Sequence, residues 1–333
     1  MRTIAVTNYK GGSGKTTTAV NLAAALGESG HRVLLIDIDP QGSSSAWLGV
    51  DDDVDGVAEA IAGRMSLSEL LYETTAPGVV LIPASPSIVV ADPQEETQIA
   101  LGFMRAMDRL PKLWDVVIID CPPTLGYLAI APMSVCQEVL IPVEARVLAM
   151  AGLTGVLETM DRVRRRLNPD LRLAGVVACR VNRTSHARAI VARLAEQFSE
   201  SFMTTTVRES IRLAEAPSFQ LPITLFAPGS TGAEDYRALA RELMVGWPAP
   251  IARPSVAIAI GAVSSAPAQT TRSRLARIAS AVSEGLGRSG GVDDAERPLN
   301  AATALDHAPA AHADATRGAS AHHKGPSADG PLL

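Results

Sequence analysis

Residues 10–17 read KGGSGKTT and carry the clearest chemical signal of the chain. They follow an apolar run, residues 4–7, and match the motif G-x-x-x-x-G-K-[ST], except that Tyr9 or Lys10 replaces its first glycine. The backbone N–H groups of such a glycine-rich turn can cradle a phosphate group, because no side chain blocks the approach. A helix that begins near Gly14 would add the positive end of its dipole. The segment therefore predicts a nucleotide-phosphate site.

Two lysines in this turn strengthen that prediction. The whole chain has four lysines, at positions 10, 15, 112 and 324. The motif predicts that Lys15 contacts the β- and γ-phosphates and that the Thr16 hydroxyl ligates Mg²⁺. The residues expected to surround the phosphates are Gly11, Gly12, Ser13, Gly14, Lys15, Thr16 and Thr17.

Acidic residues at two further strand ends would complete the site. Asp37 and Asp39 lie two positions apart in the segment LLIDIDPQG, which predicts that both face the same side of a strand. Asp120 closes the apolar run VVIID and precedes a pair of prolines. A carboxylate opposite a phosphate loop suits Mg²⁺ or the attacking water, whereas a turn or helix-capping acid is the simpler alternative for the first pair. Asp120 is the expected Mg²⁺-organising residue.

Apolar runs and helical patterns alternate over the first ~245 residues. This predicts an α/β fold with a doubly wound, mostly parallel sheet, in which ligands bind at the carboxyl ends of the strands. The predicted strands are Thr3–Thr7, Val33–Ile38, Val79–Pro83, Val116–Asp120, Glu138–Val143, Leu173–Cys179 and Ile223–Phe226. The predicted helices are Lys15–Glu28, Val57–Arg64, Glu95–Leu110, Ala149–Arg166, Ala187–Phe202 and Ala233–Val245.

The composition changes after Trp247. Residues 248–333 contain no Phe, Trp or Tyr and are rich in Ala, Pro, Ser and Gly, which predicts a mostly disordered tail after a domain over residues 1–247. Only residues 271–287 have helical spacing, as a linker helix, a partner-docking helix or a membrane-surface helix. No apolar run reaches the ~18 residues that would span a membrane. The three cysteines lack metal-ligand spacing and are expected to be buried free thiols.

Four segments together resemble the ParA/MinD family of deviant Walker A ATPases, and most closely its short, Soj-like ParA members. They are KGGSGKTTT, DIDPQG, IIDCPP and VRESIRLAEAPSFQLPI, in this order over residues 1–245. The resemblance implies a P-loop NTPase that uses ATP and Mg²⁺, with weak intrinsic hydrolysis.

Roles for individual residues follow from the same resemblance. Lys10 matches the signature lysine, which reaches the phosphates of a partner subunit in an ATP-sandwich homodimer. Lys15 matches the lysine that serves its own nucleotide, and Thr16 matches the Mg²⁺ ligand. Asp39 matches the acid that positions the hydrolytic water, and Asp120 the acid that holds Mg²⁺ through water. Hydrolysis would then loosen the dimer.

A basic region predicts a nucleic-acid partner. Residues 160–215 hold eleven arginines and six acidic residues, a local charge of +5 on a chain whose net charge is −5. Family resemblance implies non-specific double-stranded DNA binding by the dimer here, with Arg212, Arg183 and Arg188 as the expected contacts and Arg208 as a weaker one. Arg164–Arg166 would serve equally well as a solvated helix end.

These expectations favour a cytoplasmic, nucleoid-associated partition ATPase that is released from DNA when a ParB-like or other small basic, cargo-bound partner stimulates hydrolysis. One alternative is positioning of a protein organelle by the same cycle. Another is a MinD-like membrane-surface ATPase, although the C-terminal sequence HHKGPSADGPLL is no amphipathic helix. A metabolic enzyme of the cobyrinate or nitrogenase-iron-protein type would need a substrate domain or paired cluster cysteines. Intact Lys15, Asp39 and Asp120 argue against a relative that has lost hydrolysis.

Overall fold

A computed structural model describes residues 1–248, except residues 52, 89–92, 125 and 147–148. The predicted tail over 248–333 and its helix at 271–287 lie outside the described residues, apart from Pro248. The boundary proposed at residues 247/248 therefore stays a prediction.

In the described part of the chain, seven strands form one sheet in the order β3-β4-β2-β5-β1-β6-β7. All neighbouring pairs are parallel except β3 with β4. Every residue of β1, β2, β4 and β5 is buried, which explains why these strands read as continuous apolar runs. The strands are β1 (Arg2–Val6), β2 (Val33–Asp37), β3 (Tyr72–Glu73), β4 (Val79–Ile82), β5 (Val116–Asp120), β6 (Glu138–Glu144) and β7 (Arg172–Cys179).

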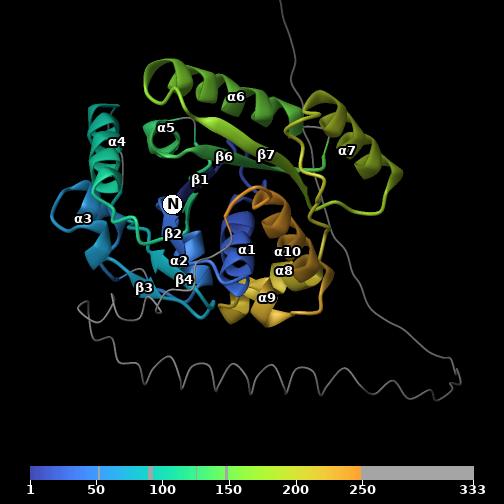
Figure 1. The fold of residues 1–333 in the computed structure, drawn as a ribbon, viewed down its shortest axis with the longest axis horizontal. Coiled ribbons are helices and arrows are strands. Elements are labelled where there is room, and N and C mark those ends of the chain that lie inside the picture. Colours follow the sequence, from blue (N-terminus) through green and yellow to red (C-terminus); the bar gives the residue numbers. More distant parts are fainter. Residues whose placement is uncertain (52, 89–92, 125, 147–148, 249–333) are drawn as a thin grey trace, which may run out of the picture. The chain divides into compact units, whose positions relative to one another are not determined.

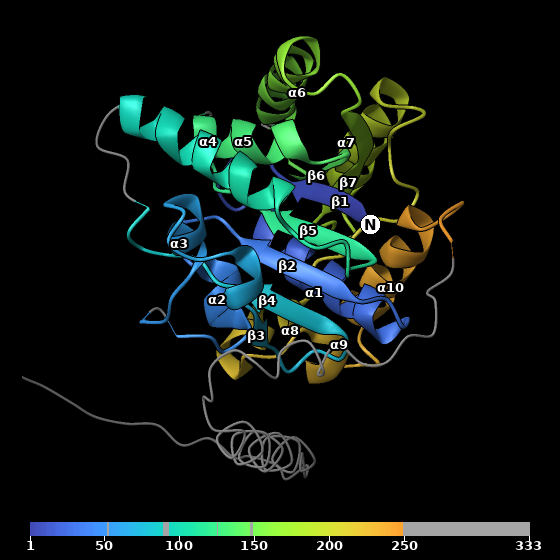
Figure 2. The same cartoon turned by 60° about the vertical axis from the view of Figure 1, so that its left-hand side comes forward.

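Helices cover both faces of the sheet (Figures 1 and 2). The α-helices are α1 (Lys15–Glu28), α2 (Ser43–Trp47), α3 (Val57–Ile61), α4 (Pro93–Asp108), α5 (Tyr127–Val135), α6 (Ala149–Arg166), α7 (Ser185–Gln197), α8 (Ile211–Glu215), α9 (Ile223–Phe226) and α10 (Thr231–Leu243). Two 3₁₀ turns complete them, η1 (Leu67–Glu69) and η2 (Ala216–Phe219). The predicted α/β fold with a doubly wound, mostly parallel sheet is confirmed.

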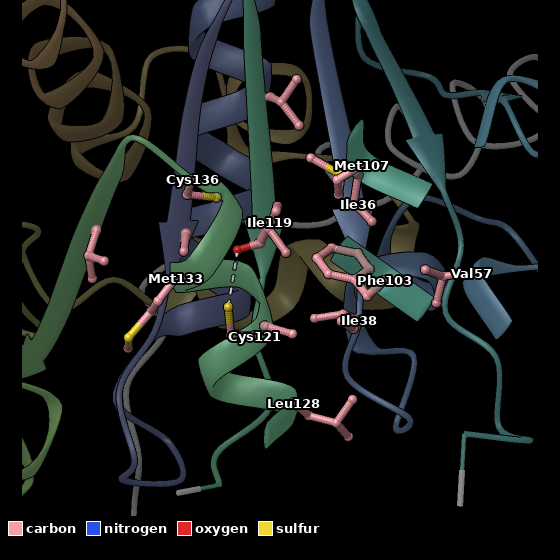
Figure 3. Packing of buried hydrophobic residues seen from close by; sticks show 14 of the residues in the cluster. Ile36, Ile38, Val57, Phe103, Met107, Ile119, Cys121, Leu128, Met133 and Cys136 are labelled. Carbon is pink, nitrogen blue, oxygen red and sulfur yellow. Dashed lines mark hydrogen bonds between the residues drawn. The ribbon is translucent and has the colours of Figure 1, made fainter. Parts of the chain in front are cut away.

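Two apolar cores lie on opposite faces of the sheet. On one face, side chains of α4, α5, α6 and the strands form one cluster, in which Figure 3 shows Phe103 of α4 beside Ile36 and Ile38. On the other face, α1 and α10 pack together, with Leu22 and Tyr236 fully buried. The three cysteines are free and buried, as predicted. The central strands are thus held rigidly, with their carboxyl ends at one edge.

The predicted strand at Ile223–Phe226 is wrong, because the segment forms the short helix α9. Its first amide donates a hydrogen bond to the side chain of Asn21 on α1, at 2.7 Å. The Phe226 amide donates a hydrogen bond to the Pro222 carbonyl group, at 2.9 Å. The backbone groups of a four-residue apolar run are therefore satisfied by a turn on α1, and such a short run cannot distinguish a strand from a buried helical turn.

Candidate nucleotide-binding site

The phosphate-binding loop, residues 9–17, follows β1 and ends in the first turn of α1, as predicted. Gly12 and Gly14 have φ values of +73° and +94°, a left-handed conformation that side-chain-bearing residues rarely adopt. The carbonyl group of Gly14 already accepts a hydrogen bond from the Thr18 amide, at 2.8 Å. Glycine at position 14 thus lets the chain turn sharply into α1, so that the first amides of the helix remain available for an anion.

An open cavity of about 740 Å³ adjoins this loop. The loop lines one side of it, and the segment that contains α8 lines another. Its lining residues are Gly11, Gly12, Gly14, Lys15, Thr16, Thr17, Asp39, Gln41, Ser43, Pro123, Arg180, Glu209, Ser210, Ile211, Leu213 and Ala214. Of the predicted nucleotide-site residues, Lys10, Ser13 and Asp120 are not among them. The cavity brings together the loop, Asp39 and the segment just before Arg212.

Lys15 lies in the floor of the cavity. Its side chain is nearly buried, and its ammonium group donates to the backbone carbonyl of Lys10 at 3.3 Å. Burial lowers the pKa of Lys15, and the negative charge of Asp120 partly opposes this shift. A poorly solvated ammonium group gains strongly from a phosphate placed next to it.

Asp120 lies at the end of β5, level with Val6 of β1 and Asp37 of β2. The side chain is fully buried, and its Oδ2 atom accepts a hydrogen bond from the Ser44 hydroxyl, at 2.7 Å. The Oδ1 atom is buried and accepts no hydrogen bond from any residue that the structure describes. Burial raises the pKa of Asp120, and the hydroxyl groups of Ser44 and Thr16 partly offset this.

The free Oδ1 atom provides a test of the predicted Mg²⁺ site. A buried carboxylate oxygen without a partner is costly, and a metal-bound water would supply the missing donor. Thr16 lines the cavity together with Lys15. This donor set fits Mg²⁺, which prefers few protein ligands and keeps several waters. The described residues contain no cluster of three or more His, Cys, Asp or Glu side chains that could bind a metal by itself.

Asp37 and Asp39 do not share one environment, although their spacing predicted a common strand face. β2 ends at Asp37, which is fully buried and accepts hydrogen bonds from the amide and the hydroxyl of Ser45, both at 2.9 Å. Burial, reinforced by Asp120, raises the pKa of Asp37. Asp39 lies beyond the strand, lines the cavity and accepts a hydrogen bond from the Gln41 amide, at 3.0 Å. Asp37 therefore anchors α2, and Asp39 is the acid that a nucleotide would meet.

Ser44 and Ser45 were not predicted as part of the site. Both are buried at the start of α2 and bind the two carboxylates at the ends of β5 and β2. The run of three serines after Gly42 was the available signal, because it marks a helix start. Their partners, however, depend on how α2 packs against the sheet.

The predicted DNA contacts lie on two neighbouring segments. Val181 pairs with Arg208 in an isolated parallel bridge, so the stretch that leads to Arg183 and Arg188 runs beside the stretch that leads to Arg212. Arg183 and Arg188 are exposed, while Arg212 pairs with Glu215 at 3.0 Å. Arg208 is bound to Asp235 through its guanidinium group, at 2.6 Å. The guanidinium group of Arg208 thus makes an ion pair within the fold, which makes it a weaker candidate for a DNA contact.

No helix among the described residues is both long and apolar enough to cross a membrane.

Comparison with known proteins agrees with the arrangement of the site. The family model of an AAA domain matches residues 1–173. The chromosome-partitioning ATPase Soj of Thermus thermophilus is 41% identical over 73% of this chain and 96% of its own length. The chromosome partitioning protein ParA of Myxococcus xanthus is 38% identical over 73% of this chain and 88% of its own length.

A solved structure extends the agreement to the cofactors. Cobyrinic acid a,c-diamide synthase from Mycobacterium smegmatis, with a bound ATP analog and magnesium, is 32% identical with a TM-score of 0.64, over 74% of this chain and 96% of that one. These ligands correspond to the ATP and Mg²⁺ predicted from the motifs. The predicted family is confirmed. The chain belongs to the ParA/MinD family of deviant Walker A ATPases.

Proposed function

We propose that this protein is a partition ATPase that hydrolyses ATP to ADP and phosphate with weak intrinsic activity. The observation that carries the proposal is the different placement of the two lysines in the phosphate-binding loop. Lys15 lines the cavity, whereas Lys10 does not. Lys15 is therefore placed to serve the protein's own nucleotide, whereas Lys10 lies outside that cavity with a side chain that is 35% exposed, where a second copy could reach it.

The roles of the site residues follow from their positions. The backbone of Gly11, Gly12, Ser13 and Gly14, with Lys15, Thr16 and Thr17, would hold the phosphates. Thr16 and, through water, Asp120 would hold Mg²⁺, which neutralises charge on the phosphates when bound. Asp39 would orient the attacking water, because it lines the same cavity as the loop. Lys10 would stabilise the phosphates of the partner subunit.

The dimer would bind double-stranded DNA without sequence preference. Arg183, Arg188 and Arg212 on two copies would together form a larger basic surface than one copy offers. ATP hydrolysis would remove the γ-phosphate that joins the copies and so release the DNA. A ParB-like or other small basic partner on the cargo would stimulate this step. The protein would then be cytoplasmic and associated with the nucleoid.

An ATPase assay with and without plasmid DNA and liposomes tests this proposal. Stimulation by DNA supports the partition function, and the Lys10→Ala variant should lose it. Stimulation by liposomes alone would favour the MinD-like alternative, whose candidate helix at 271–287 lies outside the described residues. No stimulation by either would reopen a metabolic function, such as the synthase activity named for the similar Mycobacterium smegmatis protein.

A further inference from the structure

One buried carboxylate, Glu144, faces three cations at the edge of the nucleotide site. It is the last residue of β6, and its side chain is 7% exposed. Its Oε2 atom lies 3.6 Å from the Nζ atom of Lys10. Its Oε1 atom lies 3.0 Å from Nε of Arg146 and 3.1 Å from a terminal nitrogen of Arg180. The two arginine contacts are ion pairs rather than aligned hydrogen bonds, since Oε1 accepts none among the described residues.

The backbone around Lys10 places its side chain beside this carboxylate. The Lys10 amide donates to the side-chain oxygen of Asn8, at 3.1 Å. The side-chain nitrogen of Asn8 donates in turn to the Pro142 carbonyl, at 2.8 Å, two residues before Glu144 on the same strand. Asn8 therefore joins the phosphate-binding loop to the carboxyl end of β6. Gly152 of α6 packs close to this part of the loop, because a Cβ atom added at Gly152 would lie 3.6 Å from the Cβ atom of Lys10.

The second partner of Glu144 links it to the wall of the cavity. Arg180 has a φ of +54°, a left-handed conformation that is uncommon for a residue with a side chain. Its guanidinium group reaches Glu144 at 3.1 Å and Glu209 at 3.9 Å, and both Arg180 and Glu209 line the cavity. Glu144 would thus keep its ion pairs with Arg180 and Arg146 if Lys10 moved away.

We propose that Glu144 is a positioning residue that holds Lys10 back within its own subunit and competes with the partner's nucleotide for it. The proposal rests on the function proposed above for Lys10. Lys10 cannot pair closely with Glu144 and reach across to a second copy at once. A ligand shifts such an equilibrium only by its differential affinity for the two states, so the γ-phosphate must outweigh the Glu144 contact. The two arginines then keep the buried carboxylate paired, which lowers the free-energy cost of releasing Lys10.

Amine labelling of the nucleotide-free protein tests the contact directly. The chain has four lysines, and exposed Lys112 serves as an internal reference. In Glu144→Gln, modification of Lys10 relative to Lys112, followed by mass spectrometry, should be about two- to fivefold faster, in line with the strength of a partly exposed ion pair. Glu209→Gln removes a charge that also faces Arg180 but not Lys10, so it should leave the ratio unchanged. An unchanged ratio in Glu144→Gln would overturn the proposal.

Dimerisation tests the consequence. In a hydrolysis-blocked Asp39→Ala parent saturated with ATP and Mg²⁺, Glu144→Gln should lower the dimer dissociation constant about two- to fivefold. General damage to the site would raise this constant instead. Glu28→Gln, which removes one charge from a surface pair with Arg237, is the matched control and should not shift it. Glu144→Asp, whose shorter side chain lengthens the Lys10 contact, should give an intermediate value and replaces Glu144→Gln if that variant does not fold.

The two arms separate the possible failures. If the Asp39→Ala parent dimerises and Glu144→Gln leaves its dimer dissociation constant unchanged or raises it, only this proposal is overturned. A parent that stays monomeric overturns the proposed dimer, and the labelling ratio then decides by itself whether Glu144 restrains Lys10.

Discussion

The hydroxyl group of Ser44 donates a hydrogen bond to one carboxylate oxygen of Asp120 at 2.7 Å, while the second oxygen is buried and has no hydrogen-bond partner among the residues that the structure describes. The two oxygens of this one buried carboxylate therefore have different environments. One oxygen fixes the side chain to the start of α2, and the other is buried at the end of β5, which lies level with Val6 at the end of β1.

Ser44→Ala should therefore weaken both the fold and the metal site. It removes the donor to a buried carboxylate oxygen, so we expect a loss of about 1–3 kcal/mol in the free energy of unfolding. Urea denaturation measures this loss. Ser134→Ala is the control, because the Ser134 hydroxyl only bonds the Ile130 carbonyl in its own helix, and it should cost about 0.5 kcal/mol or less. Equal losses in the two variants would contradict the account.

Gly14→Ala should destabilise the protein through its backbone alone. An added Cβ atom would meet only Cys179 at 3.6 Å, an ordinary contact, but the φ of +94° is strained for alanine. We expect a cost of about 1–2 kcal/mol in the free energy of unfolding. Gly11→Ala is the matched control in the same loop, since its Cβ atom would meet nothing within 4 Å. If Gly11→Ala cost as much in urea denaturation, the backbone explanation would be wrong.

His31 should make stability depend on pH. Burial lowers its pKa from 6.5, so the folded protein binds this proton less readily than the unfolded chain does. The stability that this histidine contributes is present above the unfolded pKa of about 6.5 and is lost as the pH falls below it. His31→Gln removes this dependence, so its unfolding free energy should rise relative to that of the natural protein between pH 7.5 and about pH 5. A difference that stays constant over this range would refute the prediction.

The arginines should separate into binding and structural groups. Arg188→Ala and Arg212→Ala should weaken binding of the ATP-bound protein to a DNA duplex and reduce the salt dependence of that binding, because each removes a charge that can meet a phosphate. Arg208→Ala should instead lower thermal stability, because Arg208 is bound to Asp235. Fluorescence anisotropy over a salt series tests this difference. Full DNA affinity in Arg212→Ala would remove Arg212 from the site.

Local signals predicted the central part of the fold and site well. The phosphate-binding loop combines a motif with a strand before it and a helix at its end, and the structure places Lys15 and Thr16 at a cavity there. Their roles toward a nucleotide stay predictions. Asp120 closes an apolar run, and its position at the strand end was correct.

Contacts between distant segments could not be predicted in the same way. Asp37 and Asp39 have one spacing but two environments, because β2 ends between them and α2 covers only the first. The pairing of Lys10 with Glu144 joins residues more than 130 positions apart through the register of β1 with β6. Ile223–Phe226 lacks the length that would distinguish a strand from a turn, and its packing on α1 decides between them.

The oligomeric state of the Asp39→Ala variant, with saturating ATP and Mg²⁺, tests the central claim most directly. Sedimentation velocity should show monomers without nucleotide or with ADP, and dimers with ATP. The additional substitution Lys10→Ala should restore monomers with ATP still bound. A sedimentation coefficient that ATP leaves unchanged, in a variant shown to bind it, would contradict the account.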